Sequence, residues 1–394
     1  MTTIARRRRR SARATGISSE RGLLAAALIV KNEAAVLGAC LESIKGVVDE
    51  IIVVDTGSTD ESVEIARRHG AIVHEHPWTG DFSEARNEGL ERATCDWILY
   101  IDADERLDPI DRATVEEALR DAPEVAFRLL LRPNSRSTPY REYRVWRNDP
   151  RIRFEGVIHE KIIPGIQRVA DQDGRDIGLV DLLLTHVGYE GDQTHKHRRN
   201  LPLLRRQLEA EPHNLFNLHH LFRVLDGLGE HEEAEQVLEH AVDLVQMTPV
   251  PGSDPLGSLA MLDLIRLRHY RGEQVGDLLT DARRRYPGNW LIVFYEGRYL
   301  IDTGRYEEAL ERFRSLLAVD LVTLPDAWLG AFDARIFGSL SHDACGICLF
   351  RLGRHAEAAD AWDAAAHCGE EDPSFAAKRQ LALAHAGREL SRSA

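Results

Sequence analysis

Short apolar runs alternate with segments of helical periodicity between residues 23 and 131. The apolar runs span 24–30, 50–54, 71–74, 97–101 and 125–131. Between them, apolar residues recur at three- and four-residue spacing in the segments 33–45, 60–69, 83–93 and 111–121. Alternation of strand and helix in this manner predicts an α/β fold, with a parallel or mixed sheet that helices cover on both faces.

From about residue 196 onward the pattern is helical throughout, and it repeats. Four residues recur with a constant shift along the chain: Pro212, Asn214, Gly229 and Ala234 return as Pro287, Asn289, Gly304 and Ala309. The phrase around Gly229 and Gly304 has a third copy at 352–358. We predict an all-α domain of tetratricopeptide-like repeats, because two units of about 34 residues fit into the shift. An unrelated helical bundle is the alternative.

The length of 394 residues suits two domains rather than one core. We expect a flexible basic arm at 1–22, an α/β domain at 23–195 and the helical repeats at 196–394. The joining segment 132–195 is rich in charge, tryptophan and histidine, and we interpret it as strands with loops. In it, Asp171 and Asp173 stand beside a glycine and are read as a loop.

Composition narrows the class of protein. A hydrophobic content of 43% is that of a globular chain, and a net charge of −14 argues against nonspecific binding to nucleic acid. Five scattered cysteines do not form a disulfide framework, which favours a reducing, cytoplasmic location. Cys345 and Cys348 are expected to be buried on one helix. No segment has the length of a membrane span, and the run 7–10 of arginines is not followed by a signal-peptide cleavage site.

Polar residues follow three of the predicted strands. Lys31-Asn32-Glu33 follows the first, 55–60 the second and 102–105 the fourth. Ligands of an open parallel sheet bind beyond the carboxyl ends of its strands, so these segments mark the expected site.

Asp102 and Asp104 are the strongest candidates for chemistry. Alternate residues leaving a strand end can turn two carboxylates toward one oxygen-liganded Mg²⁺ or Mn²⁺ ion, which would bridge a diphosphate. Asp55 ends the second strand, where a carboxylate can accept from a uracil N–H or, alternatively, form a turn before Gly57. Arg86 and Asn87 lie early on a helix and suit a diphosphate, with a solvated surface arginine as the alternative.

Four ordered stretches carry a resemblance to a known family. They are 27–33, 49–60, 78–87 and 96–105, which read ALIVKNE, DEIIVVDTGSTD, WTGDFSEARN and DWILYIDADE. Together they resemble the nucleotide-binding half of glycosyltransferase family 2. The branch they resemble most contains the glycopeptide-bacteriocin S-glycosyltransferases and the lipopolysaccharide-core glucosyltransferases, in which tetratricopeptide tails are common. The resemblance covers about residues 23–195.

The resemblance implies a GT-A fold, an inverting mechanism and a divalent cation, Mn²⁺ or Mg²⁺. It implies that Asp55 and Asp102 hold the nucleoside and that Asp104 holds the metal. The remaining residues expected to contact the nucleotide sugar are Val30, Asn32, Glu33, Arg86, Asn87 and Ala103.

The catalytic base is harder to assign, because the chain lacks a convincing pair of adjacent acidic residues in the second half of the domain. In their place the branch has three motifs, at 144–148, 154–160 and 185–189. We expect His159 to project from a strand as a metal ligand or base, His186 at a strand end to be a second metal ligand, and Glu160 to be the reserve base.

The sequence therefore predicts a transferase that moves a sugar, most simply from a UDP-sugar, to an acceptor. The repeats favour a peptide or protein acceptor, and a homodimer is left open. Two other classes remain: a non-catalytic repeat scaffold with a degenerate transferase domain, and a sugar nucleotidyltransferase.

Overall fold

The computed structural model describes residues 21–187, 194–247, 255–327, 330–369 and 372–393. Most of the expected basic arm, 1–20, lies outside the described residues. Eight strands form one sheet in the order β3-β2-β1-β4-β7-β6-β8-β5. The strands are β1 (Leu24–Val30), β2 (Glu50–Asp55), β3 (Ile72–Glu75), β4 (Trp97–Tyr100), β5 (Glu105–Leu107), β6 (Ala126–Arg132), β7 (Tyr140–Arg147) and β8 (Ile177–His186).

The sheet is parallel in its first half and mixed in its second. β1 pairs in parallel with both β2 and β4, as the alternating pattern predicts. β7 then lies antiparallel between β4 and β6, so β6 does not extend the parallel half directly. Of the parallel or mixed sheet that the sequence predicts, the structure has the mixed form, because β6 and β7 are joined as a hairpin, which makes antiparallel neighbours.

Helices cover both faces of this sheet. The first helices are α1 (Ala34–Ile44), α2 (Ser62–Arg68), α3 (Phe82–Arg92), α4 (Arg112–Leu119) and α5 (Ile163–Asp173). Apolar residues of α1, α2 and α4 share one buried cluster with the sheet, and those of α3 and α5 share another with its opposite face. Two apolar faces are therefore buried, which is why the strands read as near-continuous apolar runs.

Two local expectations for 132–195 are wrong. Residues 154–161 form a loop rather than a strand, closed by two backbone hydrogen bonds between Glu155 and Lys161. Gly156 and His159 have φ values of 104° and 52°, which a strand does not accommodate. Asp171 and Asp173 lie in the last turns of α5 rather than in a loop, and Gly174 ends that helix with a left-handed φ of 62°.

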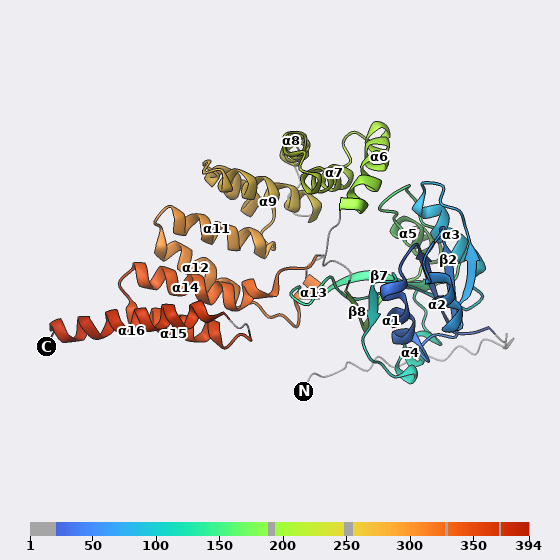
Figure 1. Cartoon of the computed structure of the whole chain (residues 1–394), viewed down its shortest axis with the longest axis horizontal. Coiled ribbons are helices and arrows are strands. Elements are labelled where there is room, and N and C mark those ends of the chain that lie inside the picture. The colour runs from blue at the N-terminus through green and yellow to red at the C-terminus, as the bar shows by residue number, and fades with distance from the viewer. Residues whose placement is uncertain (1–20, 188–193, 248–254, 328–329, 370–371, 394) are drawn as a thin grey trace.

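Helices make up the rest of the chain. They are α6 (Thr194–Ala210), α7 (Leu215–Leu228), α8 (His231–Met247), α9 (Pro255–Tyr270), α10 (Gly276–Arg285), α11 (Trp290–Asp302), α12 (Tyr306–Leu317), α13 (Leu324–Ala327), the short 3-10 helix η1 (Ala334–Phe337), α14 (Ser339–Arg351), α15 (His355–Ala366) and α16 (Pro373–Ser393). They form an extended array beside the sheet, and the C-terminus lies at its far end (Figure 1).

The repeated residues occupy equivalent places in this array. The side chains of Asn214 and Asn289 cap the first turns of α7 and α11 by accepting from backbone N–H groups. Gly229 and Gly304 follow those helices with φ values of 83° and 76°, a conformation that glycine adopts without strain. Ala234, Ala309 and Ala358 are all buried, where paired helices approach. Two helix pairs lie between each repeated residue and its next copy along the chain, as expected.

The array contacts the sheet region at two separate places. Near α6, Gln207 donates to the backbone oxygen of Ile158 at 3.3 Å, and Ile158 is buried in the helices' own apolar cluster. Further along the chain, the β6–β7 hairpin pairs with the segment before η1. There Thr138 N donates to Phe332 O at 2.8 Å, and Phe332 N donates to Thr138 Oγ1 at 2.9 Å. Figure 1 shows this second contact beside α13. Both ends of the α6–α12 segment are therefore fixed relative to the sheet.

Cys345 and Cys348 are buried free thiols on α14, one turn apart, as expected. No helix in the described part of the chain combines the length and apolar composition needed to cross a bilayer.

The hairpin contact gives a first prediction. Thr138→Val keeps the shape of the buried side chain but removes the oxygen that accepts from Phe332 N. Leaving that buried N–H without this acceptor should lower the free energy of unfolding by about 1–3 kcal/mol. Urea denaturation measures the change. Ser135→Ala, at an exposed position of the same hairpin, serves as the control and should unfold as the wild type does. Equal stability of the two variants would contradict the assigned contact.

Candidate active site

The predicted site residues gather at one edge of the sheet. Val30 ends β1 opposite Asp55 at the end of β2, and Ala27 of β1 lies opposite Tyr100 at the end of β4. Asp102 follows Tyr100 by two residues, so the three carboxyl ends meet at one edge. The sheet topology thus places the polar segments after β1, β2 and β4 side by side, as the sequence predicts.

The loops after β1 and β2 hold each other in place. Asn32 has a left-handed φ of 56°, its Oδ1 accepts from Thr59 N at 2.7 Å, and its own N–H donates to Ser58 Oγ. The buried carboxylate of Asp55 accepts from the backbone N–H groups of Gly57 and Ser58 at 3.1 Å. Asp55 therefore has the turn-forming role that the sequence offers as an alternative, and its contact with a nucleoside stays a prediction.

A network of charges surrounds Tyr100 at the end of β4. The guanidinium carbons of Arg86 and Arg144 each lie 4.4 Å from the centroid of its ring. Its hydroxyl donates to Asp102, at 3.0 Å from Oδ2, and Arg86 donates to Asp102 Oδ1 at 3.2 Å. Arg144 makes two hydrogen bonds to the buried Glu105, at 2.8 and 3.2 Å. Both arginines are thus neutralised by carboxylates of the protein itself.

The pKa values of the two carboxyls after β4 are shifted in opposite directions. Burial would raise the pKa of Asp102, but the charges of Arg86 and Arg144 and the Tyr100 hydroxyl outweigh it, so the pKa is lowered. Burial raises the pKa of Glu105 to about 7, although Arg144 opposes that shift. Glu105 Oε2 also accepts from Asp102 N at 2.9 Å. Glu105 therefore holds the turn that carries Asp102 and Asp104.

The loop 154–161 supplies the other side of this network. Glu160 forms an ion pair with Arg86, joining the loop to α3. The amide of Asn87 donates to Phe154 O at 3.0 Å and accepts from Phe154 N at 2.8 Å. Asn87 thus supports the loop, while Arg86 links Glu160 to Asp102.

Asp104 and His186 come together as expected. Asp104 Oδ2 lies 3.1 Å from His186 Nε2, where β5 pairs with the end of β8. Two neighbouring ligands of an octahedral ion, each about 2.1 Å from the metal, lie about 3.0 Å apart, so this pair fits one Mg²⁺ or Mn²⁺ ion. Within the described residues, no three His, Cys, Asp or Glu side chains are arranged to hold a metal.

His159 is not placed with that pair. Its ring stacks on His220 of α7, with centroids 3.7 Å apart, and lies edge-on to Phe216 at 5.4 Å. The expected set of Asp104, His159 and His186 is therefore not assembled in the structure. The reason is the left-handed backbone at His159, which turns the loop toward the helices.

A cleft of about 1000 Å³ runs between the sheet edge and the first helices of the array. The charged network described above lines one part of it. α6 and α7 supply another part of its wall, through Arg199, Asn200, Phe216 and His220. The site is thus shared between the α/β region and the helices.

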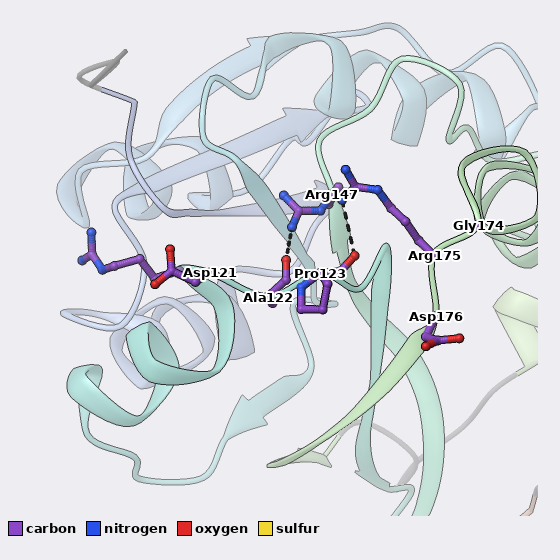
Figure 2. A pocket seen from close by; sticks show the side chains of 8 residues that line it. Asp121, Ala122, Pro123, Arg147, Gly174, Arg175 and Asp176 are labelled. Atoms are coloured by element: carbon purple, nitrogen blue, oxygen red, sulfur yellow. Dashed lines mark hydrogen bonds between the residues drawn. The ribbon is translucent and has the colours of Figure 1, made fainter. Parts of the chain in front are cut away.

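A second hollow, of about 520 Å³, lies at the opposite edge of the sheet, near the starts of β6 and β8 (Figure 2). Two of its three arginines, Arg147 and Arg175, donate to backbone carbonyls, and Arg120 pairs with Glu116. Arg147 donates to Ala122 O, and Arg175 donates to Pro123 O at 3.4 Å (Figure 2). These bonds satisfy backbone carbonyls that follow α4, so the arginines of this hollow have a structural role.

Several residues of the site were not assigned from the sequence. Glu105 follows the Asp-x-Asp motif directly, and Arg144 opens a recognised motif, yet neither position reveals that the two pair. Glu142, Tyr100 and the residues of α6 and α7 gave no signal, because their proximity depends on β7 lying beside β4 and on the docking of the helices.

Comparison with known proteins agrees with this geometry. Residues 26–169 match the family model described as Glycosyl transferase family 2. The chain is 33% identical over 245 residues to a TPR repeat-containing protein of Synechococcus elongatus, covering 60% of each chain. It is 29% identical over 225 residues to the SPbeta prophage-derived glycosyltransferase SunS of Bacillus subtilis, covering 55% of this chain and 52% of SunS. The chain thus spans between half and two thirds of the length of these relatives.

Among solved structures, glucosyl-3-phosphoglycerate synthase of Mycobacterium tuberculosis is similar at 20% identity with a TM-score of 0.35, over 48% of this chain and 79% of that one. The sequence matches thus relate the α/β region, over residues 26–169, to the glycosyltransferase family 2 domain. The helices that follow it are similar to those of a TPR repeat-containing protein.

The stacked histidines predict a pH effect. Burial lowers the pKa of His159 to about 4, and the charges of Arg199 and Lys161 act in the same direction. The folded protein then keeps His159 neutral, whereas the unfolded chain binds a proton below about pH 6.5. The free energy of unfolding should therefore fall as the pH falls from about 6.5 toward 4, with no contribution from this residue above that window.

His159→Asn tests the effect, because asparagine does not titrate and tolerates a left-handed backbone. Urea denaturation across the window should show a shallower loss of stability in this variant. A residual slope from His220 is expected, since burial lowers its pKa as well. His367→Asn, at a side chain that is 78% exposed, should keep the wild-type slope, and an unchanged slope for His159→Asn would refute the assignment.

Proposed function

We propose that this protein is an inverting, metal-dependent glycosyltransferase that moves a sugar from a nucleoside diphosphate, most simply UDP, to an acceptor. Residues 23–195 form the catalytic domain and 196–394 the repeat domain in this proposal. The observation that supports it best is the 3.1 Å approach of Asp104 and His186 beside the cleft of a family 2 domain.

The charge of the site favours a bound cation. Four carboxyl groups pair with two guanidiniums, and a fifth, that of Asp104, lies against His186, so carboxyl groups outnumber arginines in this network. A divalent ion held by Asp104 and His186 would balance this excess and stabilise the negative charge of the departing diphosphate. The carboxylates are Asp102, Asp104, Glu105, Glu142 and Glu160.

The strand-end segments provide the nucleotide site in this proposal. In this proposal Val30, Asn32, Glu33 and Asp55 bind the nucleotide next to the cleft, where the Asn32 and Asp55 hydrogen bonds fix the backbone of the two loops. Asp102, which lines the cleft, and Ala103 bind it from the turn after β4. Arg86 orients the carboxylates of Asp102 and Glu160, and contributes to nucleotide binding through them rather than through its own contact with the diphosphate.

We assign the catalytic base to Glu160. A base must hold the acceptor's proton after the reaction, and the low pKa of His159 shows that burial and nearby cations disfavour its charged form. Glu160 lines the cleft, and its Oε1 is fixed by Arg86. Its Oε2 has no hydrogen bond within the described residues, so it is available to an acceptor. His159 then packs the loop against α7.

The acceptor would enter between the sheet edge and the helices. α6 and α7 form a wall of the cleft, and repeat arrays present extended surfaces suited to polypeptides. A peptide or protein acceptor is therefore favoured.

Mass spectrometry after incubation with a panel of nucleotide sugars and Mn²⁺ tests the class of reaction. Free nucleoside diphosphate indicates glycosyl transfer or hydrolysis. Pyrophosphate made from a sugar phosphate and a nucleoside triphosphate indicates a nucleotidyltransferase instead.

Asp104→Asn should remove most of the Mn²⁺-stimulated release of nucleoside diphosphate, because the amide is a neutral and weaker ligand. We expect a loss of about 100-fold, in line with a ligand of a catalytic ion. Asp108→Asn is the matched control, since Asp108 bonds to Thr185 near His186 but does not line the cleft. Full activity of Asp104→Asn after removal of metal by EDTA would rule out the metal assignment.

Glu160→Gln tests whether Glu160 acts as the catalytic base without contributing to nucleotide binding. Glutamine keeps an oxygen that accepts from Arg86, so nucleotide affinity measured by calorimetry should stay near the wild-type value. Transfer should fall by about 100-fold or more, the usual scale of general base catalysis. If transfer persists at the wild-type rate while His159→Asn abolishes it, the base is His159.

A further inference from the structure

The first helix of the array brings a cation to the cleft. Arg199 of α6 lines the cleft together with Glu160 and Arg86. Its guanidinium carbon lies 5.1 Å from the ring centroid of Phe82, at the start of α3. Its Nε donates to Asn200 Oδ1 at 3.0 Å. The head group is therefore directed by an aromatic ring and a neutral amide.

Arg199 differs in this respect from the other arginines of the cleft. Arg86 is paired with Asp102 and Glu160, and Arg144 with Glu105 and Glu142. Across the part of the chain that the structure describes, Arg199 has no carboxylate within salt-bridge distance. Its charge is held in place but is not neutralised.

The position of Arg199 is close to the strand-end segments. Burial lowers its pKa, while the charges of Glu33 and Glu160 oppose that shift. Arg199 and Asn200 of α6 line the same cleft as Asp102, Glu160 and His186.

We propose that Arg199 is an anion-binding residue of the active site, supplied by the first repeat helix, and that it binds the diphosphate of the nucleotide sugar. This inference rests on the proposed function. A divalent ion balances only part of the charge of a departing diphosphate, and both other arginines of the cleft are already occupied by the protein's own carboxylates. Among the arginines of the cleft that the structure describes, Arg199 is the one without a carboxylate partner, and a guanidinium suits phosphate oxygens by bidentate bonding, which the ammonium of Lys161 in the same cleft does not offer.

The proposal makes the repeat region part of the catalytic machinery as well as of acceptor binding. Arg199 lies thirteen positions after His186 in sequence, yet it returns to the same cleft because α6 packs on the loop 154–161. Any change in the docking of α6 would alter donor binding too.

Titration of the protein with a nucleoside diphosphate and with its parent nucleoside tests the proposal. Wild type is first titrated with uridine, guanosine, adenosine and cytidine diphosphates in the presence of Mn²⁺, and the best ligand is kept. Arg199→Met preserves the side-chain stem on Phe82 without the charge, and Arg199→Lys restores a charge. Arg198→Met, at the adjacent exposed position outside the cleft, removes the same charge from the same helix.

Arg199→Met should weaken diphosphate binding about 10-fold or more, as loss of a charge-assisted hydrogen bond predicts, and leave nucleoside binding unchanged. Arg199→Lys should recover part of the affinity, and Arg198→Met should bind as wild type does. An equal loss for diphosphate and nucleoside would mean that Arg199 only docks α6, and would overturn the proposal. Unchanged diphosphate affinity with weaker acceptor binding would assign the anion to the acceptor and overturn it too. Failure of wild type to bind any nucleoside diphosphate would instead refute the proposed function itself.

Discussion

The burial of two arginines around Tyr100 constrains the rest of the site. An unpaired buried charge costs several kcal/mol, so Arg86 and Arg144 must have carboxylate partners at fixed positions. Those partners come from three parts of the chain: the turn after β4, strand β7 and the loop 154–161. Charge pairing therefore holds the Asp102 turn, the mixed half of the sheet and the loop 154–161 in one arrangement.

This arrangement divides the work among charged residues. Arginines that are paired within the protein organise the site, but they have little charge left for a ligand. The negative charge of a bound ligand is then balanced by groups outside the network. The candidates are Arg199 and a divalent ion held by Asp104 and His186. A preorganised set of this kind stabilises charge at a departing group without rearrangement during the reaction.

The loop 154–161 links the two regions of the protein. On one side it bonds to Arg86 and Asn87 of α3, and on the other Ile158 and His159 pack against α6 and α7. The hairpin contact at Thr138 fixes the array a second time, far along the chain. With two attachments, the array cannot rotate freely about the junction near residue 194, so an acceptor held on it would have a defined position relative to the cleft.

The sequence by itself determined the elements and the edge of the sheet that carries the site, because apolar periodicity, capping residues and left-handed glycines are local signals. It also placed Asp102, Asp104 and His186 at strand ends, where the structure has them, while their roles stay predictions. Tertiary structure decided what no local signal contains: that β7 enters the sheet antiparallel beside β4 and brings Arg144 to Glu105, and that Gly156 and His159 turn the expected strand into a loop. It also decided that Arg199 lies in the cleft, since its place depends on how α6 packs against a loop that precedes it by some forty residues. Pairings of this kind arise from long-range packing, and a sequence pattern read along the chain reports only which faces are apolar, not which faces meet.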